Sequence, residues 1–321
     1  MFTNTKLLNI NLQLFGELNT QTTGTGTLSP EMKTFYSDYL IDNAEPKLVH
    51  DQFGQKHPIP KNGGKTIEFR KYSPLPKMLT PLVEGVTPDG QSLTVSTIEA
   101  TVAQYGGYIT LSDVLLMTAI DNNMVQATKL LGNQAGATLD TITREVLNGG
   151  TNVIYAGGVE SRGAVSAVLT VDDVKKAVRA LKTQNAEKID NSFVGIIHPD
   201  CSYDLTNDPK WEAVKTYDPS DWYEGEIGRI FGVRFVETTE AKIFENGIYS
   251  TLILGDNAYG VTEVEGGGLE HIVKQLGSAG TADPLNQRAT VGWKATKVAE
   301  RLVEQFMVRI ESKSTFEGAV N

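Results

Sequence analysis

The feature that most constrains the fold is a run of apolar residues at helical spacing between Thr110 and Leu147. The apolar positions are three or four residues apart, which is the period of one helix face. They are Leu116, Ile120, Met124, Ala127, Leu131, Ala135, Leu139, Ile142 and Val146. Ser112-Asp113 and Asp121–Asn123 each offer an N-cap. We therefore predict a short helix followed by a long one over residues 122–147.

The predicted long helix is unusual for a domain of ordinary proportions. At ~1.5 Å per residue it spans roughly 40 Å, and Gly149-Gly150 ends it abruptly. A helix of this length usually serves as a strut on which other elements are laid. Its apolar face is expected to form the fold and not a ligand site.

Composition and charge limit the classes of function. The chain has 321 residues, of which 40% are hydrophobic and 21% charged, as in a folded protein. Its net charge of −10 argues against a protein that grips nucleic acid over its whole surface. A single cysteine excludes an intrachain disulfide framework and a multi-cysteine zinc site. No apolar run reaches the ~18 residues of a membrane span, and no signal peptide is evident, so we expect a cytoplasmic protein.

The first third of the chain suggests projecting parts. Residues 8–15 alternate apolar and polar side chains, as a strand does, and a Thr/Gly-rich tether follows at 20–27. Such a strand must dock on the body or on a neighbouring molecule, unless the terminus is merely frayed. A helix is expected from Ser29-Pro30. Residues 51–90 are rich in Pro and Gly around one strand-like stretch at 65–72, which indicates a long extended arm or hairpin.

The rest of the chain has a mixed pattern of helices and strands. A strand over residues 93–102 is expected to lead through Gly106-Gly107, which suggest a bulge or bend in the strand that feeds the long helix. Thr170–Asp173 resembles a capping box and opens a helix. Residues 192–197 form a buried strand, His198–Cys201 turns out of it, and residues 203–205 form a helical turn. Further strands are expected at 233–237, 250–254, 259–264 and 301–310.

No motif for catalysis or metal binding withstands comparison with a simpler explanation. Gly63-Gly64-Lys65-Thr66 lacks the upstream glycine and the following helix of a phosphate-binding loop. His198 and Cys201 lack an oxyanion motif, so a structural cysteine is the preferred interpretation. The four histidines have no ligand-like spacing. The acids at Asp172-Asp173 and at 218–226 are explained first by capping and by a solvated surface. We therefore predict no catalytic residue, no cofactor and no metal.

Several stretches, in order along the chain, resemble one protein family. They are Leu82–Gly90, Ile98-Glu99-Ala100, Gln104–Tyr108, Leu111-Ser112-Asp113, Ile197–Asp200 with Tyr203-Asp204-Leu205, Asp283–Arg288, Val291–Lys294 and Met307–Ile310. Together they resemble the major capsid proteins of tailed bacteriophages, specifically the family typified by the coat protein of coliphage N-four. Asn11–Phe15 is similar to the opening of many phage coat proteins.

The resemblance implies an α+β fold of the phage Hong Kong 97 type. It would contain an N-terminal arm at 1–30, an arm helix at 31–50 and an extended β-hairpin loop, the E-loop, at 51–92. A peripheral domain would follow at 93–169 with the spine helix at 122–147. An axial α/β domain would occupy 170–290, and C-terminal strands at 291–321 would return to the peripheral domain.

The implied function is a non-enzymatic coat protein of the virion, assembled in the host bacterial cytoplasm. It would form pentamers and hexamers of an icosahedral shell around double-stranded DNA, with scaffolding and portal proteins as partners, loose contact with the DNA, and neither membrane nor small-molecule substrate. The expected subunit contacts are Leu12, Leu14, Phe15, Lys65, Phe69, Arg70, Lys71 and Tyr72. An encapsulin-like bacterial nanocompartment shell, or a cytoplasmic enzyme centred on Cys201 or a carboxylate pair, remains the alternative.

Overall fold

A computed structural model describes Thr20–Gln21 and residues 49–316, except 62, 74, 83, 86, 88, 120–121, 212–228, 266 and 279. The described chain mixes helices and strands and divides into two compact units. The first contains residues 106–132 and 271–293, and the second contains 49–105, 133–270 and 294–316. The predicted strand at 8–15 and the predicted helix from Ser29 lie outside the described residues.

The first unit contains the junction between strand and helix that the sequence pattern predicts. Strand β5 (Ala103–Ser112) leads directly into α1 (Asp113–Thr118), whose N-cap Ser112 accepts a hydrogen bond from the Leu115 N–H at 3.2 Å. The long helix α2 (Asn123–Asn148) then follows, within one residue of its predicted bounds. Both predicted caps and the predicted long helix are confirmed.

Three more strands belong to the sheet of this unit. β1 (Thr20–Gln21) pairs in parallel with β5 at Thr110 and Leu111. The long strand β14 (Arg288–Arg301) lies between β5 and β12 in strand order and also pairs with β13 (Glu270–Lys274).

β5 runs through both glycines, and the break from the preceding strand lies at Val102, so the bulge or bend at Gly106-Gly107 stays a prediction. The glycine whose size matters at this point is Gly292 of β14. A Cβ at Gly292 would lie 3.0 Å from the Gly107 carbonyl oxygen and 2.8 Å from the Tyr108 Cβ. Small residues let the two backbones approach closely at this point.

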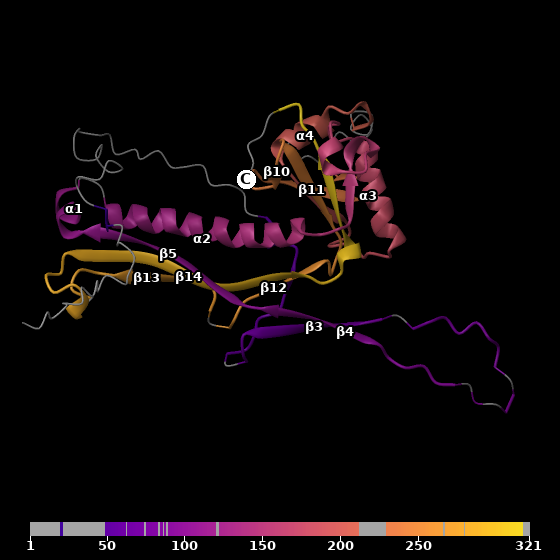
Figure 1. The fold of residues 1–321 in the computed structure, drawn as a ribbon, viewed down its shortest axis with the longest axis horizontal. Helices are drawn as coiled ribbons and strands as arrows, with labels where there is room; N and C mark the ends of the chain where they lie inside the picture. The colour runs from indigo at the N-terminus through magenta and orange to yellow at the C-terminus, as the bar shows by residue number, and fades with distance from the viewer. Residues whose placement is uncertain are drawn as a thin grey trace, which may run out of the picture. The chain divides into compact units, whose positions relative to one another are not determined.

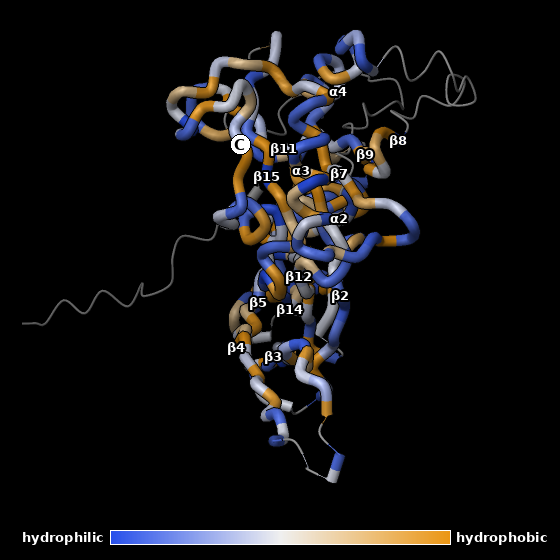
Figure 2. The backbone as a smooth tube through the Cα atoms, turned by 90° about the vertical axis from the view of Figure 1, so that its right-hand side faces the viewer, coloured by the Kyte–Doolittle hydropathy of each residue, from blue (hydrophilic) through white to orange (hydrophobic). Residues whose placement is uncertain are grey.

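The second unit is built on a seven-stranded sheet with the order β6-β15-β11-β7-β9-β8, with β10 paired to β11. Its strands are β6 (Val153–Tyr155), β7 (Phe193–Ile197), β8 (Arg229–Ile230), β9 (Val233–Glu237), β10 (Ile243–Phe244), β11 (Ile248–Leu254) and β15 (Met307–Ser312). Every residue of β7, β11 and β15 is buried. Strands covered on both faces read as continuous apolar runs, which explains why 192–197 and 250–254 were predictable. In Figure 2, orange hydrophobic stretches occur in this region among white and blue ones.

Each face of this sheet packs against a separate group of apolar side chains. One face lies against α3 (Val171–Thr183) and α4 (Pro199–Thr206), through residues such as Val174, Leu181 and Leu205. The other packs against Leu147 near the end of α2 and against Tyr259. Tyr259 begins β12 (Tyr259–Thr262), which pairs with β14 and with β2 (Gln55–Lys56).

The predicted capping box is confirmed, because the Thr170 hydroxyl accepts a hydrogen bond from the Asp173 N–H at the start of α3. Two other expectations are corrected. His198–Cys201 opens α4 rather than a turn, since Pro199 fits the first helical position and His198 caps the helix. The predicted strand at 301–310 is not continuous. It covers the end of β14 and most of β15, and a 3-10 turn at Glu304–Phe306 separates the two strands.

A β-hairpin completes the second unit. β3 (Thr66–Tyr72) pairs antiparallel with β4 (Val95–Thr101) over seven residue pairs, and the two strands lie side by side in Figure 1. The predicted strand at 65–72 is thus confirmed. A strand, and not a helix, follows Gly63-Gly64-Lys65, which also agrees with the rejection of a phosphate-binding loop.

Candidate functional site

The β3–β4 hairpin is the part of the described chain with the most exposed apolar side chains. The apolar side chains from the end of β3, through the connecting loop, to the start of β4 are exposed by 44% to 83%, with Leu79 at 83% and Leu82 at 75%. They are Tyr72, Leu75, Met78, Leu79, Leu82, Leu93 and Val95. A cluster of this kind on one projecting element marks a surface that another molecule covers.

Near its base the hairpin is packed against its own unit. Phe69 is half-buried, and a Cβ on Gly260 of β12 would lie 3.1 Å from its ring. His57 meets the Phe69 ring edge-on, with centroids 6.1 Å apart. The glycine at position 260 therefore leaves room for this aromatic side chain, which fixes the base of the hairpin.

The chain that enters the hairpin is tied to α2 by a buried histidine. The His50 N–H donates to Asp140 Oδ1 at 2.8 Å, and His50 Nδ1 lies 2.7 Å from Asp140 Oδ2. The Tyr259 hydroxyl donates to the His50 carbonyl, and burial raises the pKa of Tyr259. Both His50 and Asp140 are almost completely buried, so each needs the other to satisfy its polar atoms.

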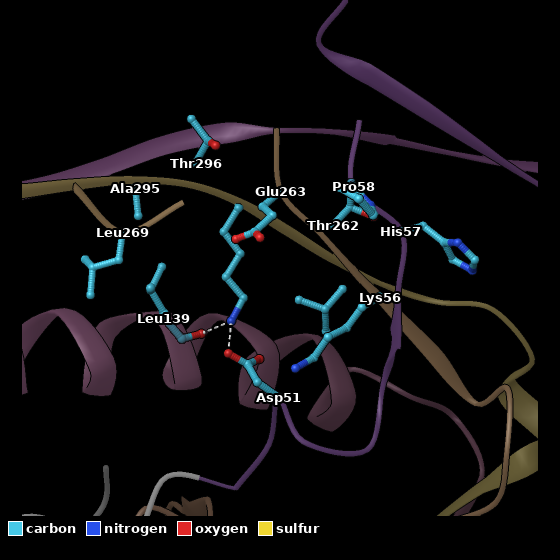
Figure 3. A pocket seen from close by; sticks show the side chains of 12 residues that line it. Asp51, Lys56, His57, Pro58, Leu139, Thr262, Glu263, Leu269, Ala295 and Thr296 are labelled. Carbon is cyan, nitrogen blue, oxygen red and sulfur yellow. Dashed lines mark hydrogen bonds and ion pairs between the residues drawn. The ribbon is translucent and has the colours of Figure 1, made fainter. Parts of the chain in front are cut away.

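An ion pair next to this histidine joins the same entering segment to β14 and to α2 (Figure 3). The buried Lys297 amine of β14 pairs with Asp51 and donates to the Leu139 carbonyl of α2 at 2.8 Å. The Thr143 hydroxyl of α2 donates to the same Asp51 carboxylate. A buried ammonium needs such compensation, because desolvation otherwise costs several kcal/mol. We call His50, Asp51, Asp140, Thr143 and Lys297 the root cluster.

A cavity of about 350 Å³ borders the root cluster. Figure 3 shows Lys56, His57 and Glu263 around it, together with the apolar Leu139, Leu269 and Ala295. No group of three or more possible metal ligands occurs in the described part of the chain. Within the root cluster the charged groups satisfy one another across elements, which suits the cluster to holding the hairpin base.

A second buried ionic group lies on the C-terminal strand. The fully buried Glu311 of β15 accepts hydrogen bonds from Arg162 at 2.7 Å and from Arg309 at 2.8 Å. The hydrogen bond that Arg162 donates to Glu311 raises the pKa of Arg162, whereas burial lowers the pKa of Arg309. Both guanidinium groups also lie over the Phe244 ring. Sequence reasoning missed both ionic groups, because partners such as Arg162 and Glu311, 149 positions apart, or Asp51 and Lys297, 246 positions apart, leave no local pattern.

The histidine and cysteine of the alternative enzyme hypothesis have structural surroundings. Cys201 is buried, its Sγ lies 3.7 Å from the Ser312 Oγ, and burial raises the pKa of its thiol to about 12. His198 Nδ1 accepts the Asp200 N–H at 3.2 Å, and burial lowers the pKa of His198. Asp172 forms ion pairs with Lys175 and Lys210. A thiol with a raised pKa is a poor nucleophile, which supports the structural interpretation.

The predicted contact residues fall into two groups. Lys65, Phe69, Arg70, Lys71 and Tyr72 all lie on or beside β3, and all except the half-buried Phe69 are exposed. Leu12, Leu14 and Phe15 lie outside the described residues. No helix among the described residues is long and apolar enough to cross a membrane.

Comparisons with known proteins agree on one class. Solved capsid structures of three phages superpose on most of the chain at low identity, which shows a shared fold. They come from cyanophage P-SCSP1u (TM-score 0.67, 14% identity, 91% of this chain and 96% of that one), Ralstonia phage GP4 (0.67, 13%, 94% and 100%) and cyanophage Pam1 (0.65, 14%, 99% and 100%). No curated protein sequence matches.

A family comparison extends this agreement from the fold to the sequence. Residues 95–305 match the family model described as phage capsid protein, which is more than half of the chain. The matched region contains α1, α2, all of β14 and every strand of the seven-stranded sheet except β15. This chain belongs to the phage capsid protein family.

Proposed function

We propose that this chain is the major capsid protein of a tailed bacteriophage, whose copies assemble as pentamers and hexamers into an icosahedral shell around double-stranded DNA. The family match over residues 95–305 carries the proposal. The fold shared with several phage capsids supports it. The same findings favour a phage shell over a bacterial nanocompartment and over an enzyme.

The finer assignment is a fold of the phage Hong Kong 97 type, within the group typified by coliphage N-four. The β3–β4 hairpin would be the E-loop, α2 the spine helix and the seven-stranded sheet with α3 and α4 the axial domain. The proposed boundaries are 1–30, 31–50, 51–92, 93–169, 170–290 and 291–321, except that β6 and β15 belong to the seven-stranded sheet and would join the axial domain. The β3–β4 pairing supports one refinement, because the second E-loop strand then extends to Thr101.

The exposed apolar tip of the hairpin supports contacts between copies. Leu79 and Leu82 would be covered by a neighbouring subunit, and Lys65, Arg70, Lys71 and Tyr72 would flank that contact. The root cluster would hold the base of the hairpin while its tip adapts to different neighbours. Many weak contacts of this kind add up over a closed shell. Lys65 and Lys71 are also candidate donors for a cross-link between subunits.

The remaining partners follow from the same proposal. Scaffolding and portal proteins would guide assembly in the host cytoplasm, and the finished shell would be the virion capsid. A net charge of −10 would limit adhesion to the packaged DNA, so that the genome slides during packaging. Marked affinity of empty shells for duplex DNA at physiological salt would contradict this last point.

The decisive experiment is to express the chain and examine it by negative-stain microscopy and light scattering, with scaffolding protein added where needed. We expect closed shells, or rings of five and six copies. A protein that stays monomeric under all these conditions and is stabilised by a small molecule would overturn the proposal.

A further inference from the structure

The exposed side of α3 carries a basic groove that no function above uses. The groove has a volume of about 610 Å³ and is lined by Lys175, Arg179 and Lys182 of α3 and by Phe231 of the β8–β9 turn. The three basic residues are four and three positions apart, so they share one helix face. This concentration of positive charge occurs in a chain with a net charge of −10.

Phe231 is held in the groove by an unfavourable backbone conformation. Ile230 pairs with Val233, and the two residues between them, Phe231 and Gly232, have φ angles of 50° and 80°. Such a two-residue turn normally contains Asn-Gly, because a bulky side chain is strained at positive φ. The phenylalanine is nevertheless 43% exposed, and the Lys175 amine lies 4.6 Å from its ring centroid. The turn thus presents an aromatic side chain beside the basic helix face.

The charges of the groove are only partly compensated. Lys175 lies 3.5 Å from Asp172, which also pairs with Lys210. Among the residues that the structure describes, no carboxylate pairs with the side chain of Arg179 or Lys182, and both residues are exposed. The groove therefore suits a partner that combines carboxylates with aromatic rings, which can approach lysine and arginine as well as Phe231.

The same chain contains a segment of that chemistry. Residues 218–226 hold Asp218, Asp221, Glu224 and Glu226 around Trp222-Tyr223, and no basic residue occurs between 216 and 228. The segment lies outside the described residues. It follows Trp211, which is buried in the core of the second unit, and rejoins that unit at Arg229, two residues before Phe231.

We propose that the basic groove of one copy binds the acidic, aromatic segment 218–226 of a second copy. The inference rests on the proposed function, in which identical subunits form rings. Ring formation needs a patch and its complement on different parts of one chain, so that each copy binds the next in the same sense. The groove and the segment are such a complementary pair.

Charge reversal on each side tests the pairing. Arg179→Glu/Lys182→Glu reverses the groove, and Asp221→Lys/Glu224→Lys reverses the segment. Each variant alone should reduce ring formation by at least about tenfold, as loss of about 1.4 kcal/mol would. Lys176→Glu is the matched control for Arg179→Glu, because it makes the same charge change on the same helix outside the groove. The control should form rings as the unmodified protein does.

Mixing the two reversed variants shows whether the groove binds the segment of a second copy or the segment of its own chain. In a 1:1 mixture, attractive contacts form only between unlike copies, so even-numbered rings of six should return and odd-numbered rings of five should not. If the mixture forms no rings but a single chain that carries both reversals does, the segment occupies the groove of its own chain and the proposal is wrong. If both variants form normal rings and only the groove variant loses binding to duplex DNA, the groove is a nucleic-acid site and the proposal is wrong.

Phe231→Asn gives a second test that does not depend on charge. Asparagine tolerates positive φ, so the urea midpoint of the unassembled protein should rise while ring formation falls. Unchanged ring formation would overturn the role of Phe231. Rings from the unmodified protein with unaffected variants reject only this inference, whereas a chain that never associates rejects the proposed function as well.

Discussion

At the scale of single residues, the root cluster shows how charge is accommodated inside the second unit. Lys297 is 5% exposed and depends on Asp51 and the Leu139 carbonyl, whereas Asp51 keeps part of its surface in water. The ion pair therefore joins β14 to the hairpin base without leaving an uncompensated charge. The ion pair fixes the position of β14 against the hairpin base. It need not add to stability, because a well-packed pair of apolar side chains could be as stable.

Removing one partner of this pair should be costly. We expect Asp51→Asn to lower the free energy of unfolding by about 1–3 kcal/mol, because the buried Lys297 amine loses its counter-charge. Lys297→Met in the same chain should recover part of the loss. Urea denaturation of the unassembled single and double variants measures both effects. Equal stability of Asp51→Asn and the unmodified protein would show that the amine reaches water.

His198 should make stability depend on pH. Burial lowers its pKa below the ordinary value of 6.5, so the unfolded chain takes up a proton at a pH where the folded chain does not. Stability is then complete above about pH 6.5 and falls as the pH drops below it. Asp200 and Glu237 partly oppose this effect. His198→Asn keeps a capping side chain and should flatten the change in urea midpoint between pH 7 and pH 5; an unchanged slope would assign it to other groups.

At the scale of elements, the sequence predicted what local spacing determines. The bounds of α2 and the start of α3 follow from caps and apolar period, and Ala127, Leu131 and Ala135 are buried as expected. Towards its C-terminal end, α2 instead buries Asp140, Thr143 and Arg144, while Leu139 and Ile142 are only half-buried. The partners that cause this change of face, such as His50 for Asp140, are distant in sequence. The residues next to Asp140 therefore do not predict it. The residue pattern alone predicted no strand over the 14 residues of β14, which only the resemblance placed among C-terminal strands at 291–321.

A pair of adjacent leucines tests the assignment of the α2 face. Leu131 is 3% exposed, whereas its neighbour Leu130 is 50% exposed. Leu131→Asp should lower the free energy of unfolding by several kcal/mol, because it buries an unpaired charge. Leu130→Asp makes the same change on the exposed side and should stay within about 0.5 kcal/mol. Thermal denaturation of both unassembled variants makes the comparison, and similar melting temperatures would refute the assigned face.

At the scale of the whole molecule, stability and association should be separable, because the residues proposed for contact are exposed in the single copy. Leu79→Ser/Leu82→Ser replaces two side chains exposed by 83% and 75%. The urea midpoint of the unassembled protein should therefore not change, while shell yield should fall severalfold, as loss of buried apolar area predicts. Full shell yield would show that the hairpin tip stays uncovered.

The N-terminal residues allow a parallel test. Deleting residues 1–20 should impair assembly and leave the single copy folded, since the proposed arm binds neighbouring subunits. Far-UV circular dichroism checks the fold, and light scattering measures assembly. An unaltered shell yield would favour a frayed terminus.

The position of β15 in the seven-stranded sheet has a consequence for the order of events during synthesis. Residues 307–312 lie between β11 and β6, and Arg309 pairs with Val153, which is more than 150 positions earlier. A ribosome-bound chain that has not reached Ser312 lacks a central strand and cannot close either core of that sheet. Contacts so distant in sequence also slow folding. The two cores of the second unit can therefore close only after residues 307–312 have left the ribosome.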